Sequence, residues 1–305
     1  MTKNADIQSL LKPEVLNTVE GLALLSRLVI GALPSGLNRS VRNGQGMEFK
    51  QYRSYQPGDD LRLLDWKMYA RSDRFYVKEA EVETHILVKF VLDASASMRH
   101  QDNNGLEKIA FARAIIAALA YLAVSQGDHI GLYAINDREV RQVAPQTGTF
   151  HLHRFLYELL QIQPTGQWQS TRSGQRHTML GEQKHYKEMV ICLSDLYEEN
   201  GEIFDLLKNI TARKNEVMVF HLMAQNELDL SYPAGVFSFQ DLETQAVVQV
   251  NPTAVRATYQ ANVAAYLAAI QQQALDLEMS YALFKMHEPL QDALTKFLLG
   301  RQRIL

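Results

Sequence analysis

Residues 86–98 read ILVKFVLDASASM, an apolar run that ends in one acid and two serines. A short run of this kind, rich in Val, Ile, Leu and Phe, is typical of a buried strand in a parallel sheet. Asp93, Ser95 and Ser97 follow it at alternate positions. Ligands of open α/β sheets bind beyond the carboxyl ends of the strands. The pattern therefore predicts a functional site directly after this strand.

Downstream of residue 86, short apolar runs alternate with segments of helical periodicity. The spacing predicts strands at 86–93 and 187–196 and helices at 105–127, 150–162 and 253–278, with core packing as the expected role of the last helix. This alternation predicts an α/β fold, a doubly wound and mainly parallel sheet with helices on both faces. The second strand ends at Asp195, so neighbouring strands would bring Asp93 and Asp195 to the same rim.

The segment before residue 85 has a different character. A helix-like part at 7–31 leads into a loop rich in Gly, Ser and Asn, and alternating aromatic and charged residues follow up to residue 84. We predict a small N-terminal accessory segment, residues 1–84, of helix, loop and short antiparallel strands, with Tyr55 and Trp66 in its core. Residues 85–305 are predicted to form the α/β domain.

The composition is that of a globular protein without a strong charge bias. The 305 residues are 47% hydrophobic and 21% charged, with a net charge of −3. Such a balance provides no long-range attraction to nucleic acid or anionic lipid. The single cysteine, Cys192, excludes a disulfide framework and a cysteine-rich zinc site. The apolar run at 114–124 is shorter than the roughly 20 residues that cross a bilayer. We expect a cytoplasmic protein with no membrane insertion and no nucleic-acid partner.

The residues around Asp93 exclude several chemistries. The residues flanking Ser95 are Ala94 and Ala96, and the Gly-x-Ser-x-Gly pattern of a nucleophile elbow is absent here. No glycine motif of a dinucleotide fold follows Leu92. Carboxylate and hydroxyl oxygens instead suit a hard cation such as Mg²⁺. A site with so few charged ligands leaves a position that a carboxylate of another molecule can fill, without any bond-breaking step. The competing interpretation is a capped turn, in which the same side chains satisfy backbone N–H groups.

Two resemblances follow from these residues. Asp-x-Ser-x-Ser after a first strand resembles the metal-ion-dependent adhesion site of von Willebrand factor A domains, and the SDL stretch with Asp195 resembles the third ligand loop of that family. The upstream block RSYQPGDDLRLLDWKMYARSDRFYVKEAEVE, residues 53–83, together with residues 46–49 and 93–98, resembles the DUF58 family. This resemblance implies a von Willebrand factor A-like domain that acts with a MoxR-type AAA+ ATPase, or with a client of that ATPase, as an adaptor or assembly factor and not as an enzyme.

The second ligand loop departs from the pattern of A-type domains. Those domains supply a threonine, often as Gly-Gly-Thr or Gly-Thr-Asp, whereas the corresponding loop here offers Thr165 and Thr171, with Ser170 a weaker candidate. The expected metal ligands are thus Asp93, Ser95, Ser97, Asp195 and either Thr165 or Thr171. The expected ion is Mg²⁺, with Mn²⁺ or Ca²⁺ as alternatives. Two alternative functions stay open: a metal-dependent phosphoester hydrolase and a scaffold whose degenerate site has lost its ion.

Overall fold

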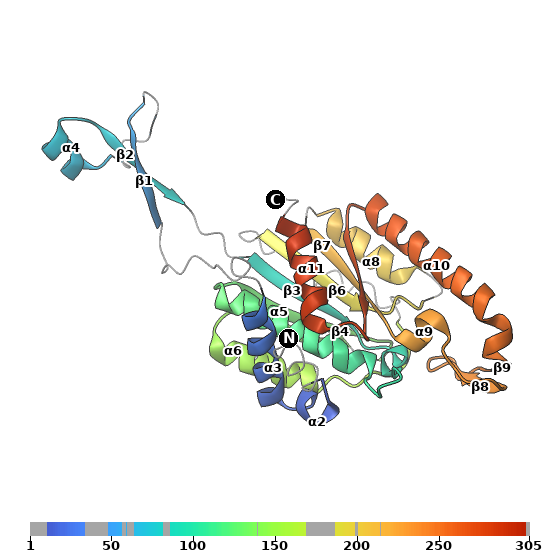
Figure 1. Cartoon of the computed structure of the whole chain (residues 1–305). Coiled ribbons are helices and arrows are strands. Elements are labelled where there is room, and N and C mark those ends of the chain that lie inside the picture. Colours follow the sequence, from blue (N-terminus) through green and yellow to red (C-terminus); the bar gives the residue numbers. More distant parts are fainter. Residues whose placement is uncertain are drawn as a thin grey trace. The chain divides into compact units, whose positions relative to one another are not determined.

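The structure is a computed structural model that describes residues 11–33, 48–56, 59, 64–81, 86–138, 140–168, 187–198, 201–213 and 215–302 (Figure 1). The chain divides into two compact units. The larger unit comprises Met1–Arg39 and Ile86–Leu305, and the smaller one comprises Ser40–His85. Each unit is described by itself.

A sheet of six strands forms the centre of the larger unit, in the order β10-β7-β6-β3-β4-β5. Its strands are β3 (Ile86–Asp93), β4 (His129–Ile135), β5 (Val140–Gln146), β6 (Lys187–Ser194), β7 (Glu216–Met223) and β10 (Ser280–Lys285). All neighbours are parallel except β5, which pairs antiparallel with β4 at the edge. The predicted doubly wound, mainly parallel sheet is confirmed, and β3 and β6 are direct neighbours.

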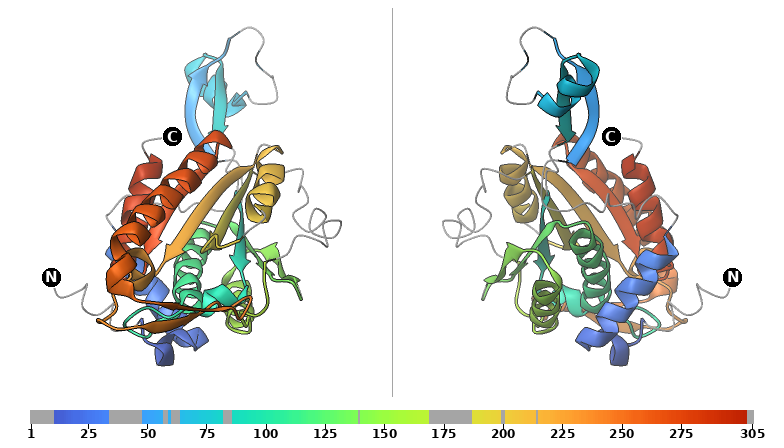
Figure 2. Two further views of the ribbon diagram at one scale, coloured as in Figure 1. Left: turned by 90° about the vertical axis from the view of Figure 1, so that its right-hand side faces the viewer. Right: turned by 90° about the vertical axis from the view of Figure 1, so that its left-hand side faces the viewer.

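Helices cover both faces of this sheet (Figures 1 and 2). One face packs against α3 (Val19–Ala32), α5 (Lys108–Ser125), α6 (Thr149–Leu160) and α11 (Leu290–Gln302); the other packs against α8 (Glu202–Thr211) and α10 (Pro252–Asp276). The alternation of β3 sends Phe90 and Leu92 into the first core and Val91 into the second. By length and hydropathy α5 could cross a membrane, but 83% of its apolar window is buried, as expected of the central helix of a core.

The N-terminal boundary differs from the prediction. The sequence analysis placed residues 1–84 in one accessory segment, whereas α3 belongs to the core of the larger unit. Leu22, Leu25 and Val29 recur at helical spacing on α3 and are fully buried in the same cluster as the residues of α5. The short helix α2 (Pro13–Leu16) precedes it, and Leu16 is buried in this core as well. An apolar helix face gains most where it meets other apolar surface, so the small unit begins only at Ser40.

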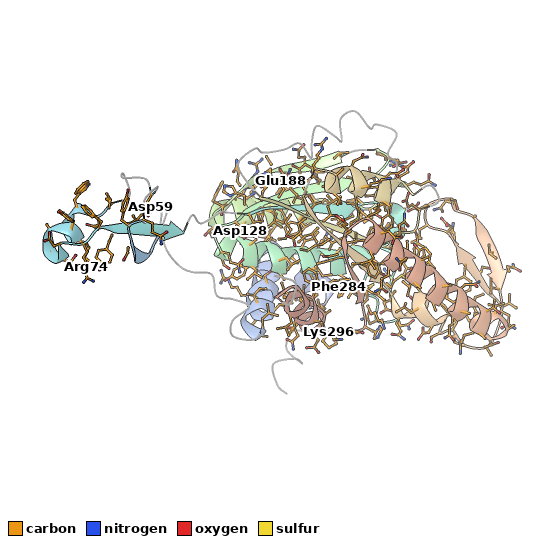
Figure 3. The ribbon with its side chains drawn as sticks, turned by 90° about the horizontal axis from the view of Figure 1, so that it is seen from above. Asp59, Arg74, Asp128, Glu188, Phe284 and Lys296 are labelled. Carbon is orange, nitrogen blue, oxygen red and sulfur yellow. The ribbon has the colours of Figure 1, made fainter. Side chains whose placement is uncertain are left out.

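The smaller unit is an antiparallel pair, β1 (Glu48–Ser54) and β2 (Tyr76–Glu81), with the helix α4 (Trp66–Ser72) between them in the sequence. The Asp65 side chain caps α4 by accepting hydrogen bonds from the backbone N–H groups of residues 67 and 68. Tyr69 stacks on Phe75 with ring centroids 4.4 Å apart. Trp66 is 62% exposed, so its predicted place in a core is wrong. Figure 3 labels Asp59 and Arg74 of this unit.

A hairpin and a long helix follow β7. The chain passes through α9 (Gln225–Asp229) into β8 (Phe237–Gln240) and β9 (Val247–Val250), which pair antiparallel. The expected core role of the next helix is wrong, because only Pro252, Ile270 and Ala274 of α10 are buried. Most alanines of α10 lie on its exposed side, and Ala274 is the one alanine of this helix that is buried.

Satisfied polar groups mark the end of the sheet at which the parallel strands begin. Asp128 accepts a hydrogen bond at 2.9 Å from the backbone N–H of Ile86, the first residue of β3. Glu188, the second residue of β6, pairs with the buried Lys89 at 2.9 Å. Figure 3 labels Asp128 and Glu188 toward this end. The carboxyl ends of β3 and β6, and with them the candidate site, lie at the opposite end.

Candidate metal centre

The two acids predicted from the strand ends lie side by side. Asp93 closes β3 and Asp195 directly follows β6, and the parallel register pairs Leu92 with Leu193 one step earlier. Ser194 Oγ donates a hydrogen bond of 2.5 Å to Asp93 Oδ2, which ties the two strand ends together. Asp93 is 2% exposed and Asp195 is fully buried. Two carboxylates thus stand close together away from water.

The two serines turn their hydroxyls toward the same point. Ser95 Oγ and Ser97 Oγ are 2.9 Å apart. Ser97 Oγ donates to Asp195 Oδ1 at 3.2 Å. Ser95 lies at the N-cap of the short 3-10 helix η2 (Ala96–Arg99) and Ser97 lies in its first turn, so the start of this helix carries both hydroxyls. Four of the six predicted ligands, Asp93, Ser95, Ser97 and Asp195, are therefore together.

The capped-turn interpretation accounts for only one of these side chains. Asp93 Oδ1 accepts a hydrogen bond of 2.9 Å from the backbone N–H of Ser95, as a turn-capping acid does. The side chain of Ser95, at the N-cap position of η2, makes no capping hydrogen bond. The serine hydroxyls are directed at each other and at Asp195, and a backbone role does not explain this.

The second loop places Thr165 beside the first. Thr165 donates its backbone N–H to the Ala94 carbonyl at 2.9 Å, and the backbone N–H of Ala96 donates to the Gly166 carbonyl at 2.9 Å. Thr165 Oγ1 accepts a hydrogen bond of 3.4 Å from Asn136 Nδ2. Thr165 is thus the candidate that the structure docks on the Asp-x-Ser-x-Ser loop. Thr171 lies outside the described residues, as does Ser170.

Gly166 makes this close docking of the two loops possible. It has a φ of +67°, and a Cβ at this position would lie 1.8 Å from Asp137 Oδ1. Only glycine fits both the positive φ and the short approach to the neighbouring loop. Gly166 therefore fixes the backbone position of the preceding residue, Thr165.

A lysine that the sequence analysis did not single out reaches the same site. Lys108, at the start of α5, is fully buried, and its Nζ lies 2.8 Å from Asp195 Oδ2 and 2.6 Å from Glu227 Oε1. Burial favours the neutral amine, but Asp195 and Glu227 outweigh it and raise the pKa of Lys108. Its ammonium also lies 5.0 Å from the ring centroid of Tyr197. Lys108 therefore occupies one oxygen of Asp195 and leaves Oδ1 to face Ser97.

A second missed residue arrives from the β8–β9 hairpin. Glu243 lines the same cavity as Ser97 and Asp195. Burial raises the pKa of the Glu243 carboxyl, and the nearby Ser97 and Ser95 side chains oppose this shift. A charged residue in a polar hairpin tip normally indicates only an exposed turn, and no sequence signal connects Glu243 to serines almost 150 residues earlier.

These groups line a cavity of about 460 Å³. Ser97, Asp195 and Lys108 lie at its polar side, together with Glu227 and Glu243. The β8–β9 hairpin contributes residues 240–244 to the lining of the cavity. Aromatic side chains also line it, namely those of Trp168, Tyr197 and Tyr266. The candidate site is therefore a pocket with a polar floor, large enough for a side chain of another molecule.

The electrostatics of the pocket favour a cation. Burial and the neighbouring charge of Asp195 raise the pKa of Asp93 to about 7. Two buried carboxylates repel each other, and a positive ion between them would relieve this repulsion. Burial lowers the pKa of the adjacent His221 to about 4, so this imidazole is neutral and supplies no charge. Lys108 contacts two of the carboxylates, Asp195 and Glu227, and makes no ion pair with Asp93 or Glu243 among the described residues, so these two acids gain no such compensation from it.

The donor set matches a hard ion. Hydroxyl and carboxylate oxygens are the ligands of Mg²⁺, whereas thiolates and clustered imidazoles select softer metals. Within the described ranges no group of three or more His, Cys, Asp or Glu side chains is arranged to hold a metal. Any ion at this site therefore needs the serine hydroxyls as ligands, and these are in place. The residues present fit the predicted group.

Several solved structures have a similar chain trace at low identity. A conserved hypothetical protein BatB from Bacteroides thetaiotaomicron is 14% identical, with a TM-score of 0.46 over 72% of this chain and 100% of that chain. An aerotolerance-related membrane protein from Bacteroides fragilis is 16% identical, with a TM-score of 0.47 over 70% of this chain and 99% of that chain. The SpRpn10 VWA domain is 10% identical, with a TM-score of 0.41 over 70% of this chain and 95% of that chain.

Relatives by sequence come from mycobacteria. An uncharacterized protein of Mycobacterium tuberculosis is 28% identical over 144 residues, which are 47% of this chain and 45% of the relative. A protein of Mycobacterium bovis matches to the same extent. The match thus spans less than half of these relatives. The profile of the family described as "Protein of unknown function DUF58" covers far more, residues 51–268. The chain belongs to the DUF58 family.

Proposed function

We propose that this protein is a divalent-metal-dependent protein-interaction module. One observation carries the proposal: the ends of two neighbouring strands bring the hydroxyls of Ser95 and Ser97 together with Asp195 Oδ1, at 2.9 and 3.2 Å. Ser97 and Asp195 line a pocket that can admit a side chain of another molecule. The arrangement binds and positions, and it needs no nucleophile or leaving group.

The ligands of the cation would be Ser95, Ser97 and Asp195, with Asp93 acting directly or through water and Thr165 at the second loop. When bound, Mg²⁺ would supply a Lewis-acidic centre that attracts a carboxylate. The chain's own residues prepare this centre. Ser194 and the Ser95 backbone N–H hold Asp93 in place, and Lys108 fixes Asp195. A partner's acidic side chain would complete the coordination sphere.

The resemblance to DUF58 proteins suggests the partner. We propose a MoxR-type AAA+ ATPase or a client of that ATPase, with this protein as adaptor or assembly factor in the cytoplasm and not as an enzyme. The net charge of −3 gives no general attraction for an acidic partner. Recognition of a carboxylate would therefore depend on the cation itself.

The first experiment measures metal binding alone. Thermal unfolding is followed with increasing MgCl₂ or MnCl₂ after EDTA treatment, for the wild type and for Asp93→Ala and Asp276→Ala. A ligand that binds only the native state stabilises it by about 2.7 kcal/mol at one hundred times its Kd. The wild type and Asp276→Ala, whose acid lies on the exposed end of α10, should gain this stability. Asp93→Ala should not gain it.

The second experiment measures the partner. The purified protein is immobilised and a candidate MoxR-type ATPase is passed over it with MgCl₂ or with EDTA. Binding should require the ion and should be lost in Asp93→Ala but not in Asp276→Ala. Equal binding in EDTA, or by Asp93→Ala, would refute the metal-dependent mechanism. Hydrolysis of a generic phosphoester with Mg²⁺ that disappears in Asp93→Ala would instead support the hydrolase alternative.

A further inference from the structure

The tip of the β8–β9 hairpin, residues 241–246, is held in one conformation by its own hydrogen bonds. The Asp241 backbone N–H donates to the Ala246 carbonyl at 2.8 Å and closes the turn. Asp241 Oδ1 accepts from the backbone N–H groups of Glu243 and Thr244 at 2.8 and 2.7 Å. An Asx turn of this kind fixes the backbone of the following residues. Glu243 is therefore presented from a defined position.

The base of the hairpin is anchored on its aromatic side. Tyr232 contacts Phe237 and Phe239, with ring centroids 5.6 and 5.0 Å apart. Most other hairpin side chains are exposed, including Val247 at 60% and Val248 at 59%. The hairpin thus has one packed side near its base and contributes its tip to the pocket. Packing against the hydrophobic clusters of the larger unit does not account for the formation of this hairpin.

Glu243 reaches the metal pocket from the β8–β9 hairpin and lines the same cavity as Ser97 and Asp195. Its carboxyl lies near enough to the Ser95 and Ser97 side chains for them to influence its pKa. Its Oε1 atom is buried and has no hydrogen-bond partner among the described residues. A buried acceptor without a donor is costly, about 1–3 kcal/mol, so such an atom indicates a missing partner.

Charge identifies the missing partner. Glu243 and Asp195 repel each other through the pocket, and the Glu243 side chain is partly shielded from water. A hydrogen-bond donor from water would satisfy the Oε1 atom but would not reduce this repulsion. A cation held by Ser95, Ser97 and Asp195 would do both. The carboxylate of Glu243 lines the same cavity as Ser97 and Asp195 and could serve as a further ligand of that cation.

We infer that Glu243 is an internal carboxylate ligand of the cation, which the β8–β9 hairpin presents, and that an acidic partner must displace it. The inference rests on the proposed function, because it assumes a cation among the serines. It adds the identity of the resident ligand and the class of ligand that replaces it. The partner is expected to offer a Glu or Asp on an exposed turn, as the hairpin tip itself does.

The consequence is a site that is closed in the resting state. With Glu243 bound, the metal holds its full set of charged ligands, and binding of a partner requires the hairpin tip to leave. The tip can leave without disturbing the sheet, because its residues lie outside both hydrophobic clusters. The apparent affinity for the partner is then the intrinsic affinity multiplied by the fraction of molecules in which Glu243 has left the site.

The test uses Trp168 as a reporter. The chain has two tryptophans, Trp66 in the small unit and Trp168 in the wall of the pocket. In a Trp66→Phe background, quenching of Trp168 fluorescence by Mn²⁺ reports occupancy of the site. Glu243→Gln should weaken Mn²⁺ binding about 10-fold, because one charged ligand is lost. Glu158→Gln, which removes the same charge from α6 outside the pocket, should bind Mn²⁺ like the parent.

Competition is tested with a peptide that carries the tip sequence 240–245, QDLETQ. It should bind Mn²⁺-loaded Glu243→Gln at least 10-fold more tightly than the loaded parent, since the internal ligand is absent. The same peptide with Gln in place of its Glu should not bind either protein. Asp241→Ala, which loosens the tip and keeps Glu243, serves as a second variant. It should change the affinity for Mn²⁺ and the affinity for the peptide in the same directions as Glu243→Gln does.

The outcomes separate the two ideas. If the parent binds Mn²⁺ and Asp93→Ala does not, but Glu243→Gln matches the parent in Mn²⁺ and peptide binding, the internal ligand is refuted and the metal-dependent function stands. If the parent itself binds no Mn²⁺, the proposed function fails, and the inference fails with it.

Discussion

At the scale of single residues, the site depends on a balance between buried charges. Lys108 is the cation that the chain itself provides, and it reaches Asp195 and Glu227 at once. Its ammonium is fully buried, so these two contacts replace its lost hydration. Any ion held by Ser95 and Ser97 would therefore join a site in which Lys108 already compensates part of the negative charge of Asp195.

Lys108→Met should lower the free energy of unfolding by about 3–5 kcal/mol, because removal of one partner leaves buried carboxylates uncompensated. The control is Lys296→Met, whose ammonium is 72% exposed and 3.2 Å from Glu288; exposed pairs contribute about 0–1 kcal/mol. Both lysines lie in the larger unit, and Figure 3 labels Lys296. Urea unfolding in EDTA measures the two changes. Equal losses for both variants would show that Lys108 has no special role.

The sequence revealed the part of the site that is local. Asp93, Ser95 and Ser97 stand within five residues after one apolar strand, and Asp195 stands at the end of a second such strand. Lys108 and Glu243 were missed, because each reaches the site across the fold, from the start of a helix and from a hairpin tip. A lysine at the start of an otherwise apolar helix was the available signal for Lys108. Glu243 had none.

At the scale of elements, strand and helix periodicity was sufficient for the sheet and its order of layers. Periodicity failed where the same pattern of apolar residues is compatible with two different packing environments of a helix. The apolar face of α3 is typical of any packed helix, and only the fold assigns it to the core beside α5. In α10 the alanines suggested burial, but small side chains remove little apolar area from water, and the helix stays largely exposed.

The assignment of α3 to the larger unit can be tested at Leu25. This side chain is fully buried in the cluster that contains α5. Leu25→Ala should lower the free energy of unfolding of the whole larger unit by about 2–5 kcal/mol, as large-to-small changes in cores do. Leu24→Ala, whose side chain is 49% exposed on the same helix, is the matched control and should change little. A cooperative urea transition followed by circular dichroism measures both.

If α3 were only part of an accessory segment, Leu25→Ala would leave the main unfolding transition in place. An additional early transition of small amplitude would then appear. A shift of the single main transition is the result that the packing of α3 requires.

At the scale of the whole molecule, the described hydrophobic clusters and the candidate site both belong to the larger unit. Both hydrophobic clusters of the larger unit are built from residues before Ser40 and after His85 only. Each of the four strongest candidate ligands also belongs to the larger unit, as do Lys108 and Glu243. The proposed cation would therefore be held by residues of the larger unit.

Replacement of residues 40–85 by a flexible Gly/Ser linker should therefore leave a protein that unfolds cooperatively and binds Mn²⁺ with the affinity of the full chain. The physical reason is that no buried apolar side chain of the larger core is removed. Long flexible loops also destabilise a fold only slowly as they lengthen, by about 0.6 kcal/mol for each doubling. Thermal unfolding and quenching of Trp168 fluorescence by Mn²⁺ measure the two properties in the same sample. Loss of Mn²⁺ binding with the fold intact would show that residues 40–85 supply a ligand, and it would refute a metal site built from the larger unit alone.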